Sequence, residues 1–230
     1  MENLPAYLYI IFILTAIAAV YLFYRASHSR MLAVIIIGWM IFIAAMAWND
    51  FFKVTDTLPP RFLVAVAPPL IIFIILLSKK KSRAWLQSFD LKTLTILQTM
   101  RLPVEMVLYW LYLQGLMPEL MTFQGRNMDI ITGVTAPLIY FVVFHTKNQP
   151  NLLLLIWNIA GLVVLIFTVT NGVLSAPSPF QQFAFEQPNV AVLLFPFIWL
   201  PAVIVPIAYY SHIISISALI KSYKNNLGSV

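Results

Sequence analysis

The chain has 230 residues, of which 61% are hydrophobic and only 10% are charged. A soluble domain carries about 25% charged residues, so this composition excludes an ordinary soluble protein and is typical of a multi-pass membrane protein. The net charge of +6 does not indicate a nucleic-acid partner, because the basic residues gather at the ends of apolar segments, and the absence of cysteine excludes disulfides, thiolate metal sites and a cysteine nucleophile.

Seven apolar segments are long enough to be membrane-spanning helices, which need about 20 residues each. They predict an all-α protein, a seven-transmembrane-helix bundle that forms one domain over residues 1–230. The last segment is longer than one span and contains Pro196, Pro201 and Pro206, which we expect to break or tilt it. In chain order, the predicted spans cover residues 5–24, 31–51, 62–78, 91–113, 128–146, 151–172 and 190–220.

The connections between these spans alternate in charge. Ten Lys and Arg residues, Lys147 among them, fall in one set of connections and at the C-terminus, whereas three fall on the other side. The positive-inside rule therefore predicts that the N-terminus is outside and the C-terminus inside. We expect a multi-pass protein of the cell membrane, the bacterial inner membrane.

A polar stripe runs along the predicted fourth span. Its members are separated by three, four, four and three residues, which places them on one face of a helix. They are Gln98, Arg101, Glu105, Tyr109 and Tyr112. Such a stripe is expected to face protein or a wet cavity, because lipid offers no hydrogen-bond partner. Arg101 and Glu105 lie about one turn apart, so we expect them to neutralise each other in part.

Two interpretations of this stripe remain open. In the first, the charged pair and the tyrosines are structural and hold the fourth helix to its neighbours. In the second, they form a ligand or ion site in the bundle core, with Asn158 of the sixth span as a further polar group.

A second polar group is predicted at the outer face, where Asp50, Arg126 and Asp129 lie near span ends. Helix capping by Asn127 and an interfacial ion pair of Arg126 with Asp50 or Asp129 would account for it. The alternative is an outer gate or binding mouth.

Several chemistries find no support in the chain. The last span has no internal lysine to form a retinal Schiff base, and all three histidines are predicted near the cytoplasmic side. No nucleophile elbow, zinc-protease or phosphate-loop motif occurs. We therefore expect no cofactor and no metal site.

The run RLPVEMVLYWLYLQG and the following PELMTFQGRNMDIITG together resemble a segment of seven-helix bacterial integral membrane proteins. The resemblance covers about 45 residues and implies no activity. It draws attention to the charged and amide residues of the segment. These are Arg101, Glu105, Glu119, Arg126, Asn127 and Asp129.

The function that these features favour is the binding or passage of a small polar or anionic solute in a pocket on the fourth helix. Arg101 would hold the anionic group, Glu105 would balance charge or carry a proton, and Tyr109, Tyr112 and Asn158 would supply hydrogen bonds. One alternative is a membrane-embedded enzyme that acts on a lipid, with Glu105 as acid or base and Arg126 and Asp129 at the head group. Another is a non-catalytic subunit or sensor. The partners we expect are the lipid bilayer and the solute, without nucleic acid; the oligomeric state is left open.

Overall fold

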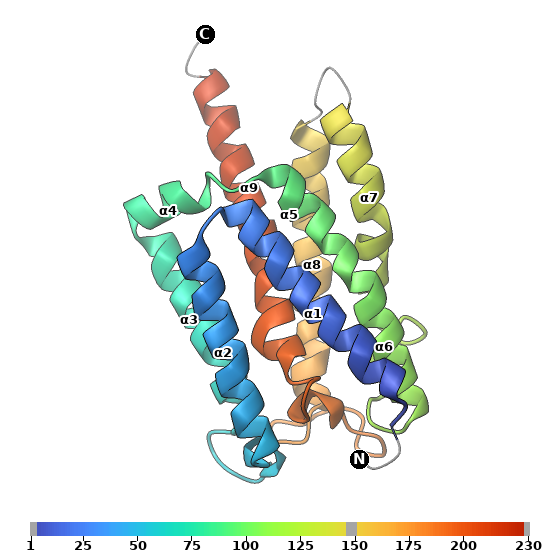
Figure 1. Ribbon diagram of the computed structural model, residues 1–230. Helices are drawn as coiled ribbons and strands as arrows, with labels where there is room; N and C mark the ends of the chain where they lie inside the picture. Colours follow the sequence, from blue (N-terminus) through green and yellow to red (C-terminus); the bar gives the residue numbers. More distant parts are fainter. Residues whose placement is uncertain (1–3, 146–150, 228–230) are drawn as a thin grey trace.

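The computed structural model describes residues 4–145 and 151–227, and these residues form helices that run roughly side by side (Figure 1). The predicted end of the fifth span at Thr146, and Lys147, lie outside the described residues. The longer helices are α1 (Ala6–Ser27), α2 (Arg30–Trp48), α3 (Leu63–Ser78), α6 (Arg101–Leu113), α7 (Asp129–His145), α8 (Asn151–Ser175) and α9 (Val205–Leu227). The shorter ones are η1 (Phe51–Lys53), α4 (Lys80–Leu86), α5 (Leu91–Leu97), η2 (Gln98–Met100), η3 (Glu119–Met121), η4 (Ala191–Leu193) and the π-helix η5 (Leu200–Ile204).

Four helices are long and apolar enough to cross a membrane: α1, α2, α8 and the continuous run Leu200–Asn225. A fifth is added if α3 and α4, which are bent by 106° at their junction, count as one span. Large apolar side chains such as Ile41, Phe141 and Val163 are at least 60% exposed on the outer faces. This exposure is typical of a surface that contacts lipid.

Two of the other predicted spans have shorter or interrupted helices. The predicted span over residues 91–113 consists of α5, η2 and α6 in direct succession, and α7 is a shorter apolar helix of 17 residues. The predicted count of seven spans therefore stays a prediction.

The last predicted span begins later than expected. Residues 191–193 form η4 and turns follow, so the long helix starts at Leu200 instead of near Val190. Pro196 and Pro201 explain the shift, because proline has no N–H for an intrahelical bond and is tolerated mainly in the first turn of a helix. Pro201 occupies such a position in η5.

Side-chain donors tie α2 and α3 to this last helix. The indole Nε1 of Trp39 donates to Ala202 O at 3.1 Å, and that of Trp199 donates to Met40 O at 3.0 Å. The hydroxyl of Tyr210 donates to Pro69 O. Pro206 lies four residues after Ala202 and has no N–H, so the Ala202 carbonyl lacks its α-helical donor and Trp39 supplies one.

We predict that Trp39→Phe lowers the free energy of unfolding by about 1–3 kcal/mol, because the carbonyl of the buried Ala202 loses this donor. Thermal unfolding of the detergent-purified protein measures the change. Trp48→Phe is the matched control, since Trp48 is 77% exposed. Equal loss of stability in the two variants would contradict the assignment.

Candidate functional site

Arg101, the first residue of α6, is buried at the centre of the bundle and is 3% exposed. Its Nε donates to Gln98 Oε1 at 3.1 Å, one NH group donates to Asp129 Oδ1 at 2.8 Å, and the other lies 3.2 Å from His212 Nε2. Gln98 and Arg101 share a helix face because they are three residues apart along the α5–η2–α6 run. The guanidinium thus has a protein partner in each of its three directions.

His212 of α9 continues this network to α8. Arginine is a donor only, so His212 must accept at Nε2, which leaves the proton on Nδ1. Nδ1 lies 2.9 Å from Asn158 Oδ1, and Asn158 Nδ2 donates to Leu154 O at 2.8 Å. Gly161 provides the space for the imidazole, since a Cβ at this position would lie 2.6 Å from His212 Cε1. The buried network therefore links α6, α7, α8 and α9.

The direct ion pair of Arg101 is not with Glu105, although the two charges lie close enough to interact as expected. Arg101 forms its ion pair with Asp129, and Glu105 Oε1 instead accepts from Asn127 Nδ2 at 2.6 Å. Asp129 competes successfully because it projects from a facing helix toward the guanidinium, whereas Glu105 lies a turn farther along the same helix.

Asn127 organises the start of α7. Its Oδ1 accepts from the backbone N–H of Asp129 at 3.0 Å, which is the capping bond that the sequence predicts, and from Thr168 Oγ1 at 3.1 Å. Its Nδ2 also donates to Met121 O at 3.0 Å. One amide side chain thereby joins the α7 start to η3, α6 and α8.

The three residues of the predicted outer mouth do not meet. Asp50 pairs with Lys53 at 2.7 Å on the exposed surface, and the Arg126 guanidinium lies 5.9 Å from the Phe183 ring centroid. Asp129 is buried with Arg101. The expected ion pair of Arg126 with Asp50 or Asp129 is therefore wrong, because Asp129 points into the bundle.

The predicted stripe is divided into two parts. Gln98, Arg101 and Glu105 are buried. Tyr109 and Tyr112 lie farther toward the end of α6 and are half-buried, with ring centroids 6.3 Å apart, and neither hydroxyl bonds to the Arg101 network. Tyr109 also packs on Phe123 at 5.1 Å. Asn158, the predicted contribution of the sixth span, reaches Arg101 through His212.

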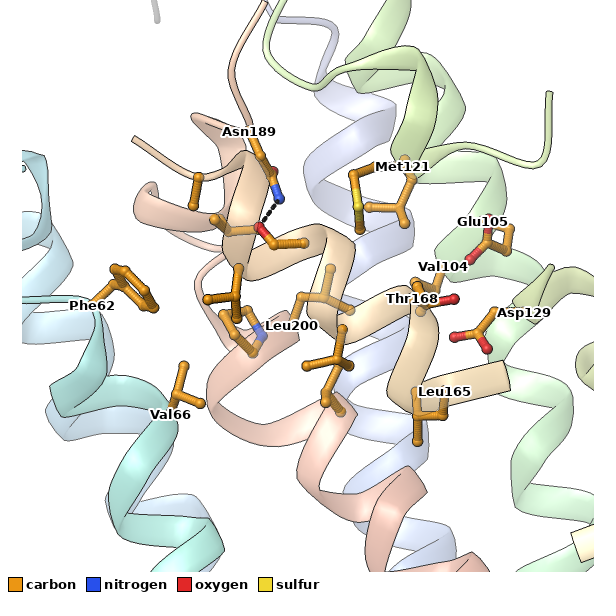
Figure 2. A pocket seen from close by; sticks show the side chains of 18 residues that line it. Phe62, Val66, Val104, Glu105, Met121, Asp129, Leu165, Thr168, Asn189 and Leu200 are labelled. Carbon is orange, nitrogen blue, oxygen red and sulfur yellow. Dashed lines mark hydrogen bonds between the residues drawn. The ribbon is translucent and has the colours of Figure 1, made fainter. Parts of the chain in front are cut away.

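A pocket of about 90 Å³ lies beside this network, between α3, α6, α8 and η5. Figure 2 shows Glu105, Asp129 and Thr168 together at one side of it, and Val66 of α3 with Phe62, which precedes α3, at the opposite side. Most of the wall is apolar. The Oε2 atom of Glu105 has no hydrogen-bond partner in the described part of the chain.

Sequence reasoning missed the role of His212, which was expected near the cytoplasmic end. The late start of the last helix explains the error, because His212 lies near the middle of the run Leu200–Asn225 and is fully buried. The prolines at 196 and 201 were the signal that could have revealed it.

These features define an all-helical protein with four or five helices able to cross a membrane and a buried polar network at its centre. Residues 58–220 match a family described as a domain of unknown function, DUF8737, and the chain belongs to this family. No curated protein and no solved structure matches the chain. The matched residues include every member of the Arg101 network and every residue that lines the pocket.

We predict that Arg101→Gln lowers the free energy of unfolding by about 3–5 kcal/mol, because Asp129 would be left as an unpaired buried charge. Adding Asp129→Asn should recover at least half of this loss, since the double variant has no charge to leave unpaired. Denaturant unfolding in detergent of both single variants and the double variant measures the coupling. Additive losses would show that the pair does not act as a unit.

Proposed function

We propose that the chain crosses the cell membrane seven times, with the N-terminus outside. The seven spans would be α1, α2, α3, the α5–η2–α6 run, α7, α8 and the η5–α9 run. At 17 residues α7 is at the lower limit of about 17 for a membrane helix.

The arrangement of charges supports this orientation. The C-terminal ends of α1, α3 and α9 lie at the same end of the bundle, and the basic helix α4 lies across it (Figure 1). Basic residues concentrated at one end of a bundle indicate its cytoplasmic side.

We predict that cysteines introduced into the cysteine-free chain at Ala84 in α4 and at Gln124, both exposed, react from opposite sides of the membrane. In intact cells, a membrane-impermeant thiol reagent should label Gln124→Cys but not Ala84→Cys until the cells are opened. Labelling of both variants in intact cells, or the reverse pattern, would contradict the proposed orientation.

We further propose that the bundle binds or passes a small polar solute. The observation that carries this proposal is the pocket between α3, α6, α8 and η5, where two carboxyl groups lie on a mainly apolar wall. Polar groups in such a position mark a binding site by default, because placing them there costs stability.

The geometry favours a hydrogen-bond donor over the anion that the sequence suggests. Every direction of the Arg101 guanidinium has a protein partner, and Arg101 is not among the pocket-lining residues. Glu105 and Asp129, which do line the pocket, are acceptors when ionised. A solute that presents donors therefore fits the pocket better than one that presents a carboxylate or phosphate.

The alternative function, a membrane-embedded enzyme that acts on a lipid, lacks its expected head-group site. It requires Arg126 and Asp129 to hold a head group together, but Arg126 lies over Phe183 while Asp129 lies with Arg101. Binding or passage of a solute needs only the pocket.

We predict that native mass spectrometry of the gently purified protein shows a reproducible bound small molecule, and that Glu105→Gln reduces its occupancy at least ten-fold. The substitution keeps the shape of the side chain but removes the carboxylate that would accept the solute's donor. Glu186→Gln, at an exposed loop position, is the control and should keep the bound mass. A mass retained by Glu105→Gln, or co-purification of a partner protein with an empty pocket, would refute the proposal.

A further inference from the structure

Two residues that line the pocket each have a buried oxygen without a hydrogen-bond partner in the described part of the chain. Glu105 and Asn189 both line the pocket and are each 1% exposed, and Glu105 Oε2 and Asn189 Oδ1 have no hydrogen-bond partner among the described residues. Asn189 Nδ2 is engaged, because it donates to Gly172 O at 3.3 Å (Figure 2). The oxygen is thus the atom left free. Buried acceptors of this kind are costly, so a bound donor would remove a penalty at each.

Of the two carboxyl groups on the pocket wall, only that of Asp129 has an ion-pair partner among the described residues. Asp129 has Arg101 as its counter-ion at 2.8 Å. Glu105 has no Lys, Arg or His within ion-pair distance in the described ranges, and its carboxyl group accepts a hydrogen bond there only from the neutral Asn127 amide. A cationic ligand would supply both the missing donor and the missing charge.

The rest of the pocket fits a small apolar body. Fourteen of its eighteen lining residues are apolar, among them Leu165 and Val169 of α8 and Leu200 of η5. Its volume of about 90 Å³ is smaller than a cavity of about 150 Å³ that accepts benzene. A ligand of a few carbon atoms is the size that this space accommodates.

We propose that the pocket binds a small primary amine, with its ammonium group on Glu105 Oε2 and a short aliphatic body against the α8 and η5 wall. The ammonium offers three N–H donors, and the pocket offers acceptors at its free atoms. This inference rests on the proposed function and specifies the chemical class of its solute. It also assigns Glu105 as the group that selects for charge, whereas Arg101 holds Asp129 in place.

The test uses the intact protein in nanodiscs of a zwitterionic lipid and three probes with the same four-carbon chain: n-butylamine, n-butanol and butyrate. Ligand-observed NMR measures binding at a fixed neutral pH, with empty nanodiscs correcting for partition into lipid. We expect the amine to bind at least ten-fold more tightly than the alcohol and butyrate not to bind. This comparison needs no variant, so it stands even if a substituted chain misfolds.

Two variants locate the binding. Glu105→Gln should reduce the preference for the amine over the alcohol at least ten-fold, while the control Glu186→Gln should leave it unchanged. Val169→Phe should fill the pocket and abolish binding of both probes.

The outcomes separate this inference from the proposed function. If the alcohol binds as tightly as the amine and Val169→Phe abolishes both, the pocket is a solute site but the amine assignment is overturned. If no probe binds, the amine assignment is overturned, whereas the proposed function fails only if native mass spectrometry also finds no bound molecule. If amine binding survives Glu105→Gln, the cation lies elsewhere and the inference is wrong.

Discussion

A guanidinium inside an apolar bundle has to be satisfied by the protein, because an apolar interior offers neither water nor acceptors. Arg101 meets this condition with three different helices or helix segments: Gln98 in η2, Asp129 in α7 and His212 in α9. Asp129 and His212 come from distant parts of the chain, so the ion pair can form only when the helices are correctly packed. His212 extends the network to Asn158 in α8, and Gly161 leaves room for the ring. The arrangement of four helices thus depends on one buried cation.

The same interaction determines the character of the neighbouring pocket. Because Arg101 uses Asp129 as its counter-ion, Glu105, which lines the pocket, is left with the amide of Asn127 and one oxygen without a partner among the described residues. Had Arg101 paired with Glu105, as their spacing on the helix suggests, the free carboxylate would have belonged to α7. The choice between two acidic partners therefore decides which helix presents an acceptor to the pocket.

Prolines have a comparable effect on the last helix. They delay its start to Leu200 and place His212 near its middle, at the depth of Arg101. Pro206 removes the N–H that would serve Ala202 O, and the indole of Trp39 bonds this carbonyl instead. The irregular start of the helix is in this way also the point where α2 is attached to it. One wall of the pocket, at Leu200 and Pro201, belongs to the same irregular segment.

The sequence by itself determined the all-helical class and most helix positions, because apolar segments of this length have few alternatives to a helix in lipid. It also placed Gln98, Arg101 and Glu105 on one face, since that inference needs only the helical period. The tertiary structure decided which side chains pair with Arg101. Asp129 and His212 lie 28 and 111 residues from Arg101, and no local pattern states which distant side chain will fill the space next to a guanidinium. That outcome follows from how the helices pack, which is a property of the folded bundle and not of any single segment.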